Sequence, residues 1–193
     1  MKWFARIAIA FVGLLILAVA VLFVLGRRAD AGRVHVVSEI DATPEQVWPW
    51  ITEGAREKQW VSWLVEVRQD KSKTGVGAKE VWVMQDANSG GRREEMEAVC
   101  TEYKPLSRVS ADISSVGMFD GRQSIAVENL GNGRTRVDVD GRFHYSQWFA
   151  ALMEPLITPA ATQKLAGDVA HLKSLVEQSK IKGAADGTAS RTF

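Results

Sequence analysis

One stretch of the chain, from Ile7 to Leu25, contains no charged or strongly polar side chain. At about 1.5 Å per residue, a helix of this length spans roughly the hydrocarbon core of a bilayer. Residues suited to a membrane interface flank the stretch: Lys2, Trp3, Phe4 and Arg6 before it, Arg27 and Arg28 after it. We therefore predict a transmembrane helix over residues 7–25, within an anchor of residues 1–28 that is separate from the globular fold.

A cleaved signal peptide is the alternative interpretation of the same segment. The tripeptide Ala-Asp-Ala at 29–31, before Gly32, resembles a cleavage site with small residues. However, the apolar run is longer than the roughly 7–15 residues of a signal-peptide core, and two arginines separate it from the cleavage site. The sequence favours a retained anchor.

The side of the membrane on which the rest of the chain lies is poorly constrained by charge. Basic residues occur in nearly equal numbers on both sides of the apolar run, and the positive-inside rule needs an imbalance. A short N-terminal tail followed by one long apolar run is typical of an uncleaved export signal. This order favours an extracytoplasmic domain.

Beyond the anchor, we expect one domain over residues 33–179 and a disordered tail over residues 180–193. Lys and Arg total 24 and Asp and Glu total 23, so the charge balance gives no reason to expect a nucleic-acid partner. The single cysteine, Cys100, excludes an internal disulfide and a cysteine metal cluster.

The order of patterns predicts an α+β fold. Residues 33–42 alternate as a strand, and Thr43 to Gln46 form a capping box at the start of a short helix. Strands and turns occupy residues 63 to 145, ending in a hairpin joined by Gly-Asn-Gly. A long C-terminal helix then carries an apolar stripe. These elements predict a curved antiparallel sheet of about seven strands wrapped around the long helix.

Few side chains suit catalysis or metal binding. The histidines, His35, His144 and His171, have no metal-ligand spacing, and Cys100 lies in mid-strand, where a core role is favoured. No serine lies in a nucleophile elbow. We therefore predict no catalytic residue, no metal site and no cofactor. Glu94 is the one carboxylate that could reach a cavity rim with a raised pKa, although a solvated strand with ion pairs is favoured.

The ordered series of motifs resembles the START-like, or Bet v 1-like, superfamily, including its polyketide cyclase/dehydrase-type (SRPBCC) members. The matching segments are "VVSEIDATPEQVWPWIT", "WVSW", the Gly-x-Gly turn at Gly75 and Gly77, "GNGRTRVDVD" and "LAGDVAHLKSLVE". The resemblance implies the helix-grip fold, with an internal cavity for an apolar or amphipathic molecule. Some members are cyclases and others carry lipids. Members with one N-terminal membrane helix are a recurring bacterial arrangement, which implies the bacterial inner membrane.

Eight apolar residues are best placed to line such a cavity, although core packing predicts the same pattern. They are Trp82, Met84, Met96, Ile113, Phe119, Phe143, Trp148 and Leu152. Trp50 lies two residues from Trp48 on one helix, so both cannot face the core squarely. We expect Trp50 to be exposed, near the cavity mouth or the membrane surface.

Three functions fit these observations. The first is a membrane-anchored domain that binds a hydrophobic or amphipathic small molecule, such as a lipid, without covalent chemistry. The second is a cyclase or dehydratase that uses the same cavity. The third is a protein-interaction module. The sequence does not specify the ligand or the oligomeric state.

Overall fold

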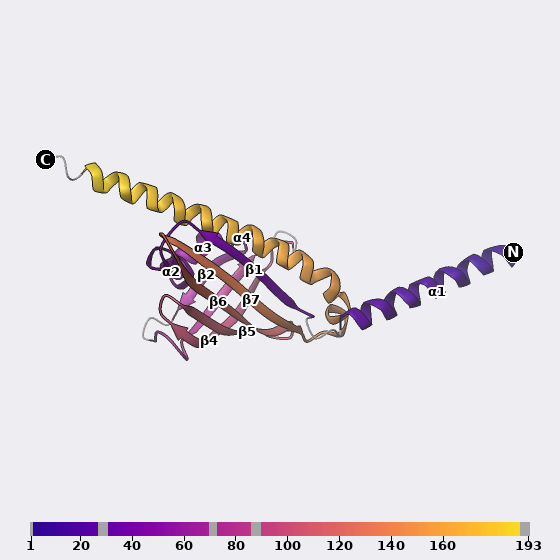
Figure 1. The fold of residues 1–193 in the computed structure, drawn as a ribbon. Helices are drawn as coiled ribbons and strands as arrows, with labels where there is room; N and C mark the ends of the chain where they lie inside the picture. Colours follow the sequence, from indigo (N-terminus) through magenta and orange to yellow (C-terminus); the bar gives the residue numbers. More distant parts are fainter. Residues whose placement is uncertain (1, 27–30, 70–72, 86–89, 190–193) are drawn as a thin grey trace.

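The computed structural model describes residues 2–26, 31–69, 73–85 and 90–189. Seven strands form one antiparallel sheet in the order β1-β7-β6-β5-β4-β3-β2. Figure 1 shows this curved sheet with the long helix α4 lying along it. The α+β helix-grip fold is therefore confirmed. The elements are α1 (Lys2–Leu25), β1 (Arg33–Ile40), α2 (Pro44–Thr52), α3 (Gly54–Trp60), β2 (Leu64–Gln69), β3 (Lys79–Gln85), β4 (Arg93–Lys104), β5 (Arg108–Ser115), β6 (Phe119–Gly131), β7 (Arg134–Tyr145) and α4 (Trp148–Ala189).

The N-terminal helix α1 stands apart from the sheet. Its segment Trp3–Leu25, 23 residues long, is long and apolar enough to cross a membrane. Figure 1 shows α1 projecting away from the domain, with its C-terminal end beside the start of α4. The domain begins close to the C-terminal end of α1. There, the backbone N–H of Phe143 in β7 donates to the carbonyl oxygen of Gly32 at 3.0 Å.

The last hairpin, formed by β6 and β7, shows how the sequence pattern determines which residues of the sheet are buried. In β7, Val137 and Val139 are almost completely buried, and the residues that alternate with them point to the other face. The turn from β6 to β7 places Gly131, Asn132 and Gly133 at positive φ, a region that glycine and asparagine tolerate best. The predicted Gly-Asn-Gly hairpin is confirmed.

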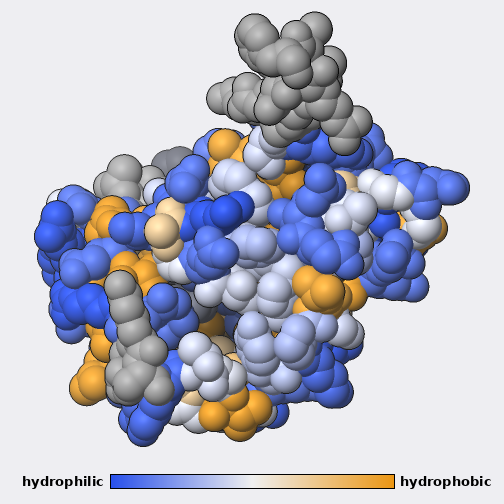
Figure 2. Space-filling view, turned by 90° about the vertical axis from the view of Figure 1, so that its left-hand side faces the viewer, coloured by the Kyte–Doolittle hydropathy of each residue, from blue (hydrophilic) through white to orange (hydrophobic). Residues whose placement is uncertain are grey.

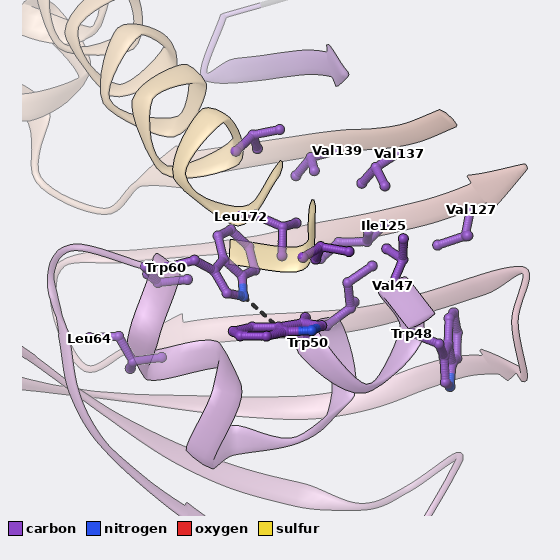
Figure 3. Packing of buried hydrophobic residues seen from close by; sticks show 14 of the residues in the cluster. Val47, Trp48, Trp50, Trp60, Leu64, Ile125, Val127, Val137, Val139 and Leu172 are labelled. Carbon is purple, nitrogen blue, oxygen red and sulfur yellow. Dashed lines mark hydrogen bonds between the residues drawn. The ribbon is translucent and has the colours of Figure 1, made fainter. Parts of the chain in front are cut away.

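The core lies between the inner face of the sheet and α4. The stripe residues Val169, Leu172 and Val176 of α4 are buried. Figure 3 shows Leu172 among side chains contributed by α2, α3 and the sheet. Each fully buried aliphatic side chain of this kind stabilises the fold by about 1.5–3 kcal/mol.

Helix α4 is longer than the sequence suggested. It runs without interruption from Trp148 to Ala189, through Pro155 and Pro159. Residues 180–189 are thus helical, where we expected a disordered tail, and residues 190–193 lie outside the described part. Figure 1 shows that α4 bends in its N-terminal part, which is where the two prolines lie and where each removes a helical hydrogen bond.

The expectation that Trp50 is exposed is wrong. Trp50 is only 7% exposed, because α3 packs against α2 and Trp50 belongs to the buried core cluster. The indole Nε1–H of Trp60 donates to the carbonyl oxygen of Trp50 at 2.8 Å, as the dashed line in Figure 3 marks. The guanidinium of Arg56 lies 5.5 Å from the centre of the Trp50 ring. Trp48, as expected, is buried.

Candidate functional site

An apolar cavity of about 430 Å³ lies between the inner face of the sheet and α4. A volume in this range suits a drug-sized or lipid-like molecule. Most of the side chains on its wall are aliphatic or aromatic, and a few are polar. The wall consists of Val34, Trp63, Trp82, Met84, Arg92, Glu94, Met96, Ile113, Phe119, Gln123, Val139, Phe143, Tyr145, Ile157, Ala161, Lys164 and Leu165.

Six of the eight predicted lining residues meet at this cavity: Trp82, Met84, Met96, Ile113, Phe119 and Phe143. Trp148 and Leu152 are not part of its wall. Trp148 is 80% exposed, because the first turn of α4 comes only after β7 has ended at Tyr145 and lies beyond the end of the sheet. The part of α4 that reaches the cavity is further along, at Ile157 and Ala161.

Local sequence explains the part of the wall near the end of β7. The rings of Phe119 and Phe143 meet edge to face, with 5.8 Å between their centroids. Phe143 also lies against Gly121 and Gly141, where an added Cβ atom would come within 2.6 and 2.9 Å of its ring. Glycine at these two positions therefore leaves room for the aromatic ring.

Polar groups occur at the same cavity. Glu94 lies on its wall together with Arg92 and Lys164. Desolvation, and secondly the charge of Glu154, raise the pKa of the Tyr145 phenol above its ordinary value of 10.0, and the phenol is a neutral hydrogen-bond donor at neutral pH.

A second cavity, of about 320 Å³, lies at the α2–α3 end of the domain. Trp82 and Gln123 are part of both walls, so the two cavities adjoin. Figure 2 shows this end of the molecule, away from α1, as a mostly hydrophilic surface. Two carboxyl side chains, Glu57 of α3 and Glu80 of β3, face the second cavity.

Glu57 is the most perturbed titratable group in the described part of the chain. It is 7% exposed, and desolvation, followed by the nearby charge of Glu80, raises its pKa from 4.5 to about 8. Glu57 is not among the site residues predicted from the sequence. The buried face of α3 consists of Gly54, Glu57 and Trp60, which recur every three residues. That spacing was the available indication in the sequence that Glu57 is buried.

The remaining polar candidates show no catalytic arrangement among the described residues. No group of three or more His, Cys, Asp or Glu side chains is placed to hold a metal ion there. Desolvation is the main reason that the pKa of the Cys100 thiol is raised, and its Sγ lies 3.4 Å from the carbonyl oxygen of Glu102. A neutral thiol of this kind is a poor nucleophile.

Solved structures share this fold at low sequence identity. A conserved protein from Geobacillus kaustophilus matches with a TM-score of 0.64 at 10% identity, covering 76% of this chain and 96% of that chain. A protein from Nitrosomonas europaea matches with a TM-score of 0.62 at 17% identity, covering 80% and 99%. A START superfamily protein from Mycobacterium smegmatis matches with a TM-score of 0.61 at 14% identity, covering 76% and 97%.

No curated protein sequence matches this chain. A family model, described as polyketide cyclase/dehydrase and lipid transport, matches residues 31–177, which hold the whole sheet, α2, α3 and most of α4. The chain therefore belongs to the polyketide cyclase/dehydrase and lipid transport family.

Proposed function

We propose that this protein is a membrane-anchored START-like domain that holds a hydrophobic or amphipathic small molecule, such as a lipid, without covalent chemistry. The observation that carries the proposal is the cavity of about 430 Å³ between the sheet and α4. Its wall is dominated by apolar side chains, and burial of apolar surface is the main source of affinity for such ligands.

The membrane part of the proposal is supported by the anchor end of the domain. The backbone N–H of Gly32 donates to the buried carboxylate of Glu154 on α4. Residues 26–31 connect Gly32 to the end of α1, and so short a segment reaches on the order of 20 Å. Trp148, Phe149 and Leu156 are exposed on this part of α4, and exposed aromatic residues suit a bilayer interface.

Lipid contact at this end is testable in nanodiscs. Brominated lipids quench tryptophans that approach the bilayer, so Trp148→Ser should lower the quenching of the full-length protein. Equal quenching of the two proteins contradicts this placement.

The ligand proposal is tested by native mass spectrometry of the full-length protein released from detergent micelles. We expect a retained small molecule. Ala161→Phe places a ring in the cavity and should abolish retention, whereas Ala166→Phe, on an exposed position of the same helix, should not. Equal retention by the two variants contradicts binding in this cavity.

A dehydratase reaction in the same cavity is the second candidate function. It is favoured by Glu94 and Tyr145, which add a carboxyl group and a neutral phenol to an otherwise apolar wall. If this reaction occurs, the molecule recovered from Glu94→Gln or Tyr145→Phe should be heavier by one water than the molecule recovered from the wild type. Identical masses contradict catalysis by these groups.

A further inference from the structure

The second cavity has a different chemistry from the apolar one. Its walls come from α2, α3, the strands β2 to β6 and residues 73–78, and it holds two carboxyl groups from separate elements, Glu57 and Glu80. Bringing two acidic side chains to one cavity is unfavourable, because like charges in a medium of low dielectric repel each other.

Glu57 has no compensating partner in the described part of the chain. No hydrogen bond or ion pair reaches its carboxyl group there, although the residue is 7% exposed. The charged group that acts on it is Glu80, which is also acidic. A buried carboxylate without a cation or hydrogen-bond donors is strongly disfavoured.

The other titratable groups at the cavity do not neutralise Glu57. Lys73 is exposed, and the Nζ of Lys79 lies 3.2 Å from Glu97 Oε1 on the solvent side of the sheet. Cys100 and Tyr103 also belong to the wall. Asp168 of α4, the helix that packs on α3, is acidic as well, and its Oδ1 accepts from the backbone N–H of Ser62.

Glu80 is fixed in place by neutral donors. Its Oε2 accepts from Trp82 Nε1 at 2.9 Å, and its Oε1 accepts from Gln69 Nε2 at 2.6 Å. These contacts orient the carboxylate without cancelling its charge. Trp82 and Tyr103 contribute aromatic rings to the same wall, and Ile125 contributes an apolar side chain.

We propose that this second cavity binds an organic cation, a protonated amine on a small apolar body, between Glu57 and Glu80. An ammonium group would supply a positively charged partner for both carboxyl groups. The aromatic rings on the wall would add to this, because aromatic faces attract cations. The apolar wall would take the body of the ligand. This site is independent of the hydrophobic-ligand proposal, because the two cavities share only Trp82 and Gln123.

Binding at this site is coupled to proton release. In the empty protein Glu57 holds a proton at neutral pH, because its pKa is raised to about 8. The amine arrives already protonated, its ammonium group pairs with the Glu57 carboxylate, and the carboxyl proton leaves to solvent. At about pH 7, close to 0.9 proton should be released for each amine bound.

The test is isothermal titration calorimetry on the full-length protein in detergent micelles, with 2-phenylethylamine as the probe and 2-phenylethanol as its uncharged counterpart. Titrations in two buffers of different ionisation enthalpy count the protons. We expect the amine to bind roughly tenfold or more tightly than the alcohol, with proton release. Protein-free micelles give the heat of partitioning, which is subtracted.

Variants make the test specific. Glu57→Gln keeps the shape of the side chain, and it should weaken the amine roughly tenfold or more and abolish proton release. Glu80→Gln should weaken the amine as well. Glu97→Gln, on the solvent side, should leave both quantities unchanged. The proposal is overturned if the wild type binds the amine and the alcohol with equal affinity. It is also overturned if Glu57→Gln, with its thermal unfolding intact, shows unchanged amine affinity and proton release.

Discussion

Replacing Glu57 by glutamine should change how the stability of the protein depends on pH. The pKa of Glu57 is raised from 4.5 to about 8 in the folded protein, so the folded state retains the proton over a pH range in which the unfolded chain releases it. The contribution of this group to stability is therefore fully present below about 4.5. It falls as the pH rises and is lost above about 8.

The magnitude follows from the proton linkage. Each pH unit within this window lowers the free energy of unfolding by about 1.36 kcal/mol. Relative to the lower end of the window, the raised pKa of Glu57 lowers the free energy of unfolding by about 3 kcal/mol at pH 7 and by on the order of 5 kcal/mol above pH 8. Glutamine is neutral throughout. Glu57→Gln should thus differ from the wild type by less than about 1 kcal/mol near pH 5 and be more stable by those larger amounts at higher pH.

Urea unfolding of the full-length protein in detergent micelles, followed by tryptophan fluorescence between about pH 5 and pH 8.5, measures this difference. The histidines are identical in both proteins, so their titration cancels in the comparison. Glu97→Gln is the matched control, because that side chain is 49% exposed and its ion pair with Lys79 is worth little. If the wild-type and Glu57→Gln stabilities differ by the same amount at every pH, Glu57 does not titrate as described.

Three further changes test other parts of the structure. Trp60→Phe removes the hydrogen bond to the Trp50 carbonyl and should lower the free energy of unfolding by about 1–3 kcal/mol in the same urea assay; no change would mean that this bond contributes nothing. Gly167→Ala, in the middle of α4 where nothing lies within 4 Å of an added Cβ, should raise the thermal midpoint through a gain of about 1 kcal/mol, and a lower midpoint would contradict the open space. Glu154→Gln should move the pKa of Tyr145 down towards its ordinary value of 10.0, which an ultraviolet titration of the two tyrosines detects, and an unmoved titration would show that the Glu154 charge does not reach the phenol.

Sequence reasoning succeeded where the determinants are local. Thr43 and Gln46 are three residues apart, and the backbone N–H of Thr43 does donate to Gln46 Oε1 at 3.0 Å. Strand alternation placed Val137 and Val139 inside because successive side chains of a strand must face opposite sides. The same rule selected the cavity residues of β3 to β7, since any inward side chain on a curved sheet meets the space beneath the helix.

Sequence reasoning failed where burial depends on a neighbour that is distant or differently placed. Trp50 was expected to be exposed from the geometry of one helix, but a second helix, α3, packs against that helix and Trp50 is buried. Trp148 was expected at the cavity because it is apolar, but its position relative to the end of the sheet depends on where β7 stops. Glu57 lies in a strongly polar stretch, and it is the packing of α3 against β2, α2 and α4 that buries this helix face.

The wall between the two cavities limits how one molecule can use both. Trp82 belongs to both walls, and its indole N–H holds Glu80 at 2.9 Å. A ligand that extended from the apolar cavity past this ring would have to displace it, and among the described residues Glu80 would then keep the donor of Gln69 alone. Losing a hydrogen bond to a charged group costs about 1.5–3 kcal/mol. The arrangement therefore favours two separate occupants, and an amine bound to Glu57 and Glu80 would hold Trp82 in place as the wall of the apolar cavity.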